Sequence, residues 1–233
     1  MNWQDIKISS DGTHFLYQGK PIFDKRFLEI LKFHAPGFAP VKDESGAYHI
    51  DSNGNPLYAE RYTRTFGFYC NRAAVVQGKY WFHINEKGER VYAYSFAWVG
   101  NFQENLCTVR DFENHYFHID LFGNPIYAQN YRYAGDFKDG IACVKLENGL
   151  FTHIDAQGNF VHHKFFQDLG VFHKGFATAK DEKGWFHIDK QGNALYPERY
   201  LLLEPFYNGF ALATAFNNEK VIIDETGKTA IKT

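Results

Sequence analysis

Six histidines recur at nearly constant spacing, and they are the first residues in the sequence whose pattern could do chemistry. The intervals between them are 35, 34, 35, 35 and 34 residues, and the six are His14, His49, His83, His118, His153 and His187. Imidazole is a common metal ligand, so one hypothesis is a metal protein or an enzyme that uses this position. A tetrahedral metal site needs three or four ligands within about 2.0–2.3 Å of one ion. Successive repeats hold equivalent residues too far apart for that, so we expect each histidine to bond the backbone or an Asp of a neighbouring repeat.

The other residues that could do chemistry favour structural roles as well. Most of the histidine segments end in an Asp or Asn, three residues before a Gly, at Asp51, Asn85, Asp120, Asp155, Asp189 and Asp224. A calcium site needs several oxygen ligands, whereas a single carboxylate in a turn is typical of a side chain that caps its own backbone. His162, His163 and His173 lie off the repeat position and could form a local cluster. Because no known catalytic motif occurs, we predict a non-enzymatic protein without cofactor or metal.

Composition excludes several classes of protein. The chain has 233 residues, a net charge of -2 and no long apolar run, so we expect neither a nucleic-acid partner nor a membrane span. Three cysteines, Cys70, Cys107 and Cys143, cannot all pair and show no CxxC spacing. Reduced thiols and the lack of a secretion signal at the start of the sequence predict a cytoplasmic protein.

The histidines belong to a longer repeat, which must supply the elements that position them. A Gly follows each histidine by five residues, and Ile222 with Gly227 opens a seventh, degenerate copy. An aromatic residue comes next in most copies, at Phe23, Tyr58, Tyr92, Tyr127 and Tyr196, with His162 and Ile231 as exceptions. Phe then follows in six copies, at Phe33, Phe68, Phe102, Phe137, Phe172 and Phe206. We therefore predict one repeat domain over residues 1–233, with about seven units of which the first and last are atypical.

Each copy divides into four short strands. A segment that ends at the recurring Phe is followed by a tight turn, then by a strand of small residues, the histidine strand and an apolar strand. The turn falls at Asn71, Asn105, Gly140, Gly175 or Gly209, and at Pro36-Gly37 in an earlier copy. In the first copy, residues 3–8 could stand in for the second strand. Repeats of this kind predict an all-β seven-unit β-propeller, and the alternative is an open β-solenoid of stacked repeats.

The histidine strand resembles the motif of the bacterial WG (KWG) repeat family. Trp185, Ile188 and Asp189 keep the family's places, and Gly175, Ala177 and Ala179 fill its small-residue strand. Phe186 and His187 depart from the motif, so the chain is similar to a His-bearing variant. The resemblance implies an interaction module, in some proteins attached to a methyltransferase domain, and it assigns no catalytic residue.

The segments that link one copy to the next are the best candidates for a binding surface. Tyr and Arg are enriched at interfaces, and these links carry Arg61, Tyr62, Tyr131, Arg199 and Tyr200. The opposing interpretation is that the aromatic rings pack between repeats and only the middle residues of each link reach water. We expect a binding or scaffolding module with a protein partner. The alternatives are a carbohydrate-binding propeller and a recognition module for a separate methyltransferase.

Overall fold

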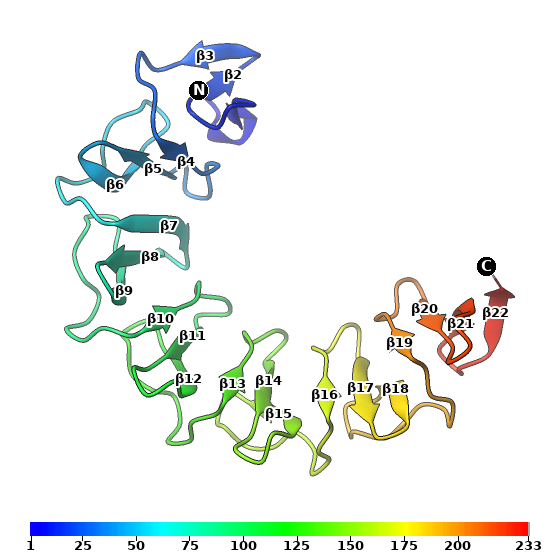
Figure 1. Ribbon diagram of the computed structural model, residues 1–233. Helices are drawn as coiled ribbons and strands as arrows, with labels where there is room; N and C mark the ends of the chain where they lie inside the picture. The colour runs from blue at the N-terminus through cyan, green and yellow to red at the C-terminus, as the bar shows by residue number, and fades with distance from the viewer. Residues whose placement is uncertain (233) are drawn as a thin grey trace. The chain divides into compact units, whose positions relative to one another are not determined.

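The computed structural model describes residues 1–232, and its strands form seven antiparallel sheets that follow the sequence repeat. Six sheets have three strands and the last has four. In every sheet the strands are ordered as in the chain, so neighbouring strands are joined directly (Figure 1). The described residues hold no α-helix, and the only helical element is the short 3₁₀ turn η1 (Trp3–Asp5). The prediction of an all-β fold built from tandem repeats is confirmed.

Packing divides the chain into two compact units, the first with residues 1–114 and 118–125, the second with 115–117 and 126 onward. The strands that begin in the first unit are β1 (Lys7–Ile8), β2 (Phe15–Tyr17), β3 (Lys20–Ile22), β4 (Glu29–Ile30), β5 (Ala39–Asp43), β6 (Gly46–Ile50), β7 (Arg64–Tyr69), β8 (Arg72–Gln77), β9 (Tyr80–Ile84), β10 (Trp98–Val99) and β11 (Cys107–Arg110). Strand β12 (Tyr116–Ile119) ends within the first unit.

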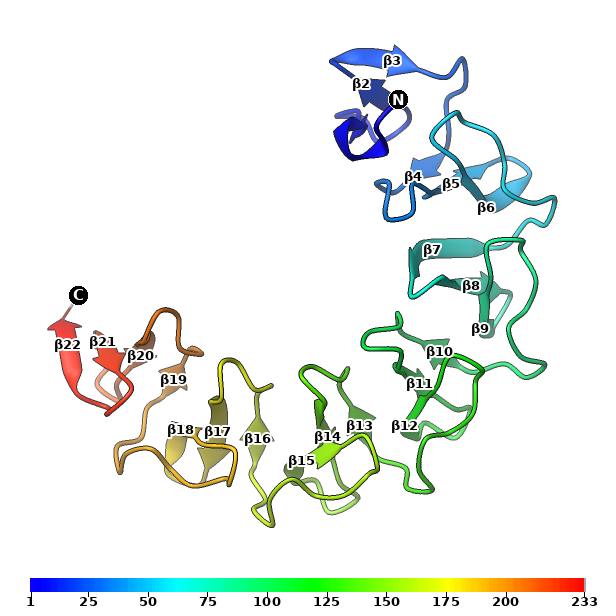
Figure 2. The ribbon, with the colours of Figure 1, turned by 180° about the vertical axis from the view of Figure 1, so that it is seen from behind.

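The second unit contains three complete sheets, which Figure 2 shows from behind. Their strands are β13 (Tyr133–Ala134), β14 (Ile141–Lys145), β15 (Phe151–Asp155), β16 (Asp168–Leu169), β17 (Ala177–Asp181), β18 (Gly184–Ile188), β19 (Leu202–Leu203), β20 (Phe210–Thr214), β21 (Lys220–Asp224) and β22 (Thr229–Lys232). The first strand of each sheet has only two residues, while the second and third pair over five.

The turn between the first two strands has the backbone that the sequence predicts. Asn71, Asn105, Gly140, Gly175 and Gly209 all have positive φ, and so does the residue before each of them. Two consecutive positive φ values are typical of a type I′ turn, whose twist matches that of the strands it joins. Asn and Gly occur here because they tolerate this conformation.

The predicted fourth strand is wrong for the middle repeats. After the histidine strand, the chain makes a single bridge, such as Ile50↔Pro56 or Ile188↔Ala194, and then leaves the sheet. The aromatic residue that follows must turn inward to reach the histidine, so the segment cannot continue along the edge. Pro56 and Pro125 also lack the N–H that a longer ladder would use. Among the described residues, β3 in the first sheet and β22 in the last extend this segment into a strand.

The first repeat begins at its second strand. β1 pairs with β2 through Lys7↔Leu16 and Ile8↔Phe15, so residues 7 and 8 take the second-strand position as expected. The residues before them form η1 rather than a strand.

Successive repeats are joined by a second kind of pairing. The histidine strand of one repeat bridges the aromatic residue that opens the next, for example Ala47↔Tyr62 and Trp185↔Tyr200. Both backbone hydrogen bonds of the Ala47–Tyr62 pair form, at 2.9 and 2.8 Å. The core consists of the apolar residues between the strands and these bridges, so each repeat buries its apolar side partly against the next.

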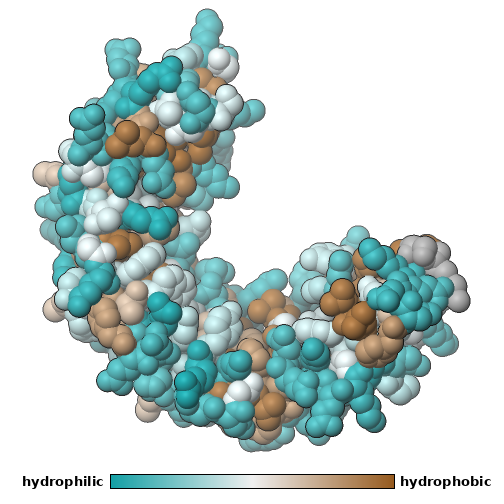
Figure 3. Space-filling view, viewed as in Figure 1, coloured by the Kyte–Doolittle hydropathy of each residue, from teal (hydrophilic) through white to brown (hydrophobic). Residues whose placement is uncertain are grey.

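The surface mixes polar and apolar side chains. Figure 3 shows hydrophobic residues as separate small patches between hydrophilic ones on the face it draws. Among residues 1–232, no helix has the length and apolar character that a membrane crossing requires.

Candidate functional site

The repeated histidine is a buried hub that connects two repeats. His49, His83, His118, His153 and His187 are 0% exposed. In four of them, Nε2 lies 2.7–3.0 Å from a backbone carbonyl 17 residues ahead, at Phe66, Gly100, Gly170 and Glu204. A carbonyl can only accept, so Nε2 carries the proton and Nδ1 is left as the acceptor. The expectation that the histidine bonds a neighbouring repeat's backbone is confirmed for these four, whereas the ring of His14 contacts Thr13 and Asp11 of its own repeat.

A tyrosine hydroxyl, and not an Asp, is the second partner of most hubs. The Tyr92 and Tyr196 hydroxyls donate to Nδ1 of His83 and His187 at 2.7 and 2.5 Å, and Tyr58 contacts His49 in the same way. The recurring Phe packs against the ring, with centroids 3.8 Å apart for His187 and Phe206. Burial lowers the pKa of the hub histidines to about 4, in His49, His83, His153 and His187. Both ring nitrogens of these four rings are occupied, which leaves no lone pair for a metal.

The Asp residues of the turns cap their own backbone. In one such turn, Oδ1 of Asp51 accepts from the N–H of Asn53 and of Asn55, both at 2.9 Å. The same pair of bonds occurs at Asp120, Asp155 and Asp189. The three cysteines form no disulfide, and burial raises the pKa of Cys143 to about 12.

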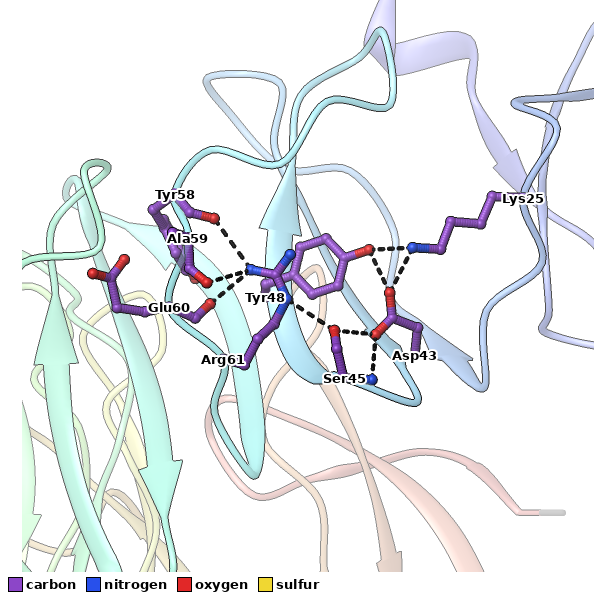
Figure 4. A network of polar contacts seen from close by, with 8 residues as sticks. All are labelled: Lys25, Asp43, Ser45, Tyr48, Tyr58, Ala59, Glu60 and Arg61. Atoms are coloured by element: carbon purple, nitrogen blue, oxygen red, sulfur yellow. Dashed lines mark hydrogen bonds and ion pairs between the residues drawn. The ribbon is translucent and has the colours of Figure 1, made fainter.

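Arg61 and Arg199, two of the predicted binding residues, cap the links that carry them. The Nη1 group of Arg61 donates to the carbonyls of Tyr58, Ala59 and Glu60 at 3.2, 3.0 and 2.9 Å (Figure 4). Its guanidinium lies 3.8 Å above the Tyr48 ring. Arg199 repeats this arrangement over Phe186 at 3.6 Å and forms an ion pair with Asp181 at 2.8 Å. Part of each arginine is accessible, while its Nη1 group bonds carbonyls of the link and its Nε bonds Ser45 or Asp181.

The predicted tyrosines lie deeper than a contact surface requires. Tyr131 is 3% and Tyr200 7% exposed, and each packs edge-to-face against a tyrosine of its own link, Tyr127 and Tyr196. Tyr62 is half-buried between Tyr58 and Phe82. The interpretation in which these rings pack between repeats therefore describes their positions.

The fifth repeat departs from this pattern. His162 replaces the tyrosine, and its Nε2 lies 3.0 Å from Nδ1 of His153. Phe165 stands where the second and sixth repeats have Arg61 and Arg199, so this link has no arginine cap. Instead, the Thr152 hydroxyl donates to the Lys164 carbonyl at 3.0 Å.

The replacement leaves two phenylalanines at the surface of the fifth link. Phe160 is 36% and Phe165 42% exposed, and their rings meet edge-to-face at 5.6 Å. His163 is exposed beside them and contacts the Phe160 ring at 6.2 Å. His162 is buried, so the predicted cluster of His162, His163 and His173 does not form as one group. We call Phe160, His163 and Phe165 the aromatic ridge.

Two open grooves flank the aromatic ridge. The first, with a volume of about 610 Å³, is lined by Gln129, Asn130, Tyr131, Leu146, Glu147, Gly158, Asn159, Phe160 and His163. The second, of about 440 Å³, is lined by Leu150, Phe165, Phe166, Gln167, Asp181, Glu182, Lys183, Pro197 and Arg199. Tyr131 thus lines the first groove and Arg199 the second. The structure does not bring Arg61 and Tyr62 to these grooves.

Charges at the groove walls are partly paired with one another. Arg132 Nε lies 2.7 Å from Glu147 at the first groove, and Asp181 is paired with Arg199 at the second. The aromatic ridge lies between these pairs, and amide side chains of Gln129, Asn159 and Gln167 line the grooves beside it. Sequence reasoning did not select Phe160 and Phe165. The exception at His162 in the aromatic register was the signal that could have identified them.

Known structures with similar folds are β-propeller-like. A eukaryotic initiation factor aligns with a TM-score of 0.60 and 13% identity, over 98% of this chain and 72% of that one. The computationally designed Ika8 protein aligns with a TM-score of 0.54 and 11% identity, over 98% and 83%. BamB from Moraxella catarrhalis aligns with a TM-score of 0.52 and 11% identity, over 98% and 81%. At such low identity these likenesses describe the fold alone.

Sequence comparison identifies the repeat itself. The curated proteins include no significant match to the chain. The profile of the WG containing repeat matches residues 50–81 and 118–150, two stretches that begin at the end of the second and fourth histidine strands and include the turn and the link that follow. The predicted resemblance is confirmed over these two stretches, which match the WG containing repeat.

Proposed function

We propose that the chain is a non-enzymatic scaffold that binds a protein partner through its links, with the aromatic ridge of the fifth repeat as the main contact. The observation that carries this proposal is the exposed pair Phe160 and Phe165, set between two open grooves. Exposed aromatic side chains at the centre of a patch, bordered by polar groups, are typical of protein interaction sites. The hub histidines and the turn Asp residues described above already have partners within the fold, and so do the Nη1 groups of Arg61 and Arg199.

The predicted binding residues have different parts in the proposed contact. Arg199 borders the second groove and Tyr131 the first, so both can shape the contact with a partner. Arg61 and Tyr62 lie on the corresponding link of the first unit, where they would make a secondary contact with the partner. Tyr200 is buried against Tyr196 of the same link. A cytoplasmic location agrees with the three free thiols and remains part of the proposal.

Site-specific cross-linking tests the proposal. A photoreactive phenylalanine analogue at position 165 should give discrete adducts with one protein in cells. The same analogue at Phe122, which is 69% exposed in another repeat, is the matched control. The cross-linked partner, once purified, should bind the wild-type chain and lose at least about tenfold in affinity with Phe165→Ala, as removal of a central aromatic anchor predicts.

Two results would contradict the proposal. One is a partner that binds Phe160→Ala/Phe165→Ala as tightly as the wild type. The other is the recovery of glycans instead of proteins, with binding on a glycan array that is lost in the same double variant. In that case the chain would be a carbohydrate-binding module.

A further inference from the structure

The base of the aromatic ridge rests on a buried pair of histidines. His153 Nε2 donates to the Gly170 carbonyl at 2.9 Å, and His153 Nδ1 lies 3.0 Å from His162 Nε2. The rings meet nearly perpendicularly, at 89°. His162 is 5% exposed, at the side of the hub where the fifth link begins. The repeats centred on His49, His83 and His187 place a tyrosine hydroxyl at this point.

The hydrogen bonds of the pair require both rings to be neutral. Since His153 Nε2 carries the proton that binds Gly170, its Nδ1 must accept, and His162 Nε2 must donate. The remaining nitrogen, Nδ1 of His162, then accepts from the Lys164 N–H at 3.4 Å. A proton added at this nitrogen would make it a donor that faces another donor. A tyrosine hydroxyl in its place gains no proton in acid, so the other links lack this response.

We propose that the His153–His162 pair is an acid-sensitive latch that holds residues 160–166 against the hub at neutral pH and releases them when His162 takes up a proton. The second ring is the one that responds, because His162 lies at the edge of the hub and His153 at its centre. A buried imidazolium is also costly, so proton uptake is coupled to movement of the link into water.

The charged and titratable groups around the pair do not remove the conflict between two donors, the protonated Nδ1 of His162 and the Lys164 N–H. Asp189 of the sixth repeat attracts a proton to His162, whereas the neighbouring His163 repels it, and burial lowers the pKa of His162 overall. The Cβ and Cγ atoms of Lys164 lie beside His162 at Gly192, and the Lys164 residue is exposed. Cys143 lies opposite His153 in the β14–β15 pairing, and its thiol stays protonated. Asp168 follows on β16, where its carboxylate accepts from the Leu169 N–H.

The latch deepens the proposed function, because the released segment carries Phe160, His163 and Phe165. Acid would therefore release the residues of the aromatic ridge from their ordered positions. Partner binding would weaken at this link only. The latch itself can be tested without a partner, so its failure and that of the proposed function are distinguishable.

Hydrogen–deuterium exchange of the whole protein between pH 7 and 5 tests the latch. After correction for the intrinsic pH dependence of exchange, protection of residues 158–166 should fall by about tenfold relative to residues 193–200, the corresponding segment with Tyr196. His162→Tyr restores the hydroxyl and should keep this ratio within about twofold. His163→Gln changes the exposed neighbour and should retain the wild-type response.

Several results would overturn the latch. The latch does not exist if, in the wild type, the protection of residues 158–166 changes in parallel with that of residues 193–200 at every pH. It does not exist either if His162→Tyr loses the same protection in acid as the wild type does. Should His162→Tyr fold poorly, an NMR titration of the wild-type protein decides. The Lys164 amide shift must then follow the titration of His162, and an amide shift that follows His163 instead would overturn the proposal.

Discussion

At the scale of single residues, the hub explains why histidine recurs. The position needs a buried ring that donates at one end and accepts at the other, and neutral imidazole does both. Its Nε2 holds the next repeat and its Nδ1 holds the tyrosine of its own link. Phe102 packs on the His83 ring, with centroids 4.7 Å apart, so the same side chain also belongs to the apolar core.

Replacing a hub histidine should be strongly destabilising. His187→Ala leaves the Tyr196 hydroxyl and the Glu204 carbonyl without their partner and opens a cavity beside Phe206. Removal of one partner of buried polar groups together with a large side chain predicts a loss of about 3 kcal/mol in the free energy of unfolding. Urea denaturation measures it, and the exposed His163→Ala is the control. Equal costs for the two variants would show that the hub is not a stabilising element.

The two tyrosines that open the third and fifth repeats should respond differently to loss of their hydroxyls. The Tyr62 hydroxyl donates to the Gly88 carbonyl at 3.1 Å, whereas the buried Tyr131 hydroxyl has no partner among the described residues. Tyr62→Phe should therefore lower the free energy of unfolding by about 1 kcal/mol. Tyr131→Phe should leave it unchanged or raise it, because it removes a buried hydroxyl that lacks a hydrogen bond. A loss for Tyr131→Phe as large as that for Tyr62→Phe would contradict this assignment.

At the scale of the elements, the turn after each histidine strand fits against the link of the preceding repeat. Gly88 has a φ of +79°, and a Cβ there would lie 2.6 Å from the Tyr58 ring. Gly54, Gly123, Gly158, Gly192 and Gly227 show the same close approach to Phe23, Tyr92, Tyr127, His162 and Tyr196 or their neighbours. The glycine thus serves both the turn and the contact between repeats.

A matched pair of glycine substitutions separates these two contributions. Gly78 also has a positive φ, of +61°, but no atom lies within 4 Å of its added Cβ. Gly78→Ala should cost about 1 kcal/mol for the backbone alone. Gly88→Ala adds the clash with Tyr58 and should cost about 2–3 kcal/mol. Thermal or urea unfolding compares them, and similar losses would mean that Tyr58 moves aside easily.

The sequence was sufficient to predict elements whose signal is local. Positive-φ turn residues such as Asn71 and Gly140 are visible as residue types, and so are the alternating strands around them. The short fourth segment was not predictable, because it ends where Tyr58 or Tyr196 turns toward a histidine nine residues earlier. The arginine caps were not predictable either, because the arginine that covers an aromatic ring does not always occupy the same position in the repeat. Arg90, at another position in its repeat, lies 4.0 Å above Phe82 much as Arg61 lies above Tyr48.

At the scale of the whole molecule, the hub histidines together make the free energy of unfolding depend on pH in acid. Their pKa is about 4 in the folded chain, whereas an exposed histidine titrates near about 6.5. Between these two values the unfolded chain binds more protons than the folded one. Stability is therefore fully present above the unfolded pKa and is lost as the pH falls toward the folded pKa.

Urea unfolding at several pH values should reveal this loss. Each hub histidine contributes on the order of 3 kcal/mol when the pH reaches the folded value, so four of them make a steep dependence. We expect the unfolding midpoint to fall continuously from pH 7 to pH 5, before most carboxylates titrate. His163→Gln should leave the slope unchanged. A midpoint that is constant down to pH 5 would mean that the hub histidines titrate normally.

The histidine hub also bears on how such a chain can change its length. The hubs at His49, His83, His153 and His187 each bond a carbonyl of the copy that follows, so these junctions share the same bond. Deleting or duplicating one whole period would rejoin two halves of the same junction and would require no new complementary surface. Recombination between copies can therefore lengthen or shorten the protein without an intermediate that fails to fold, while a single variant copy, such as the fifth, can acquire a task of its own.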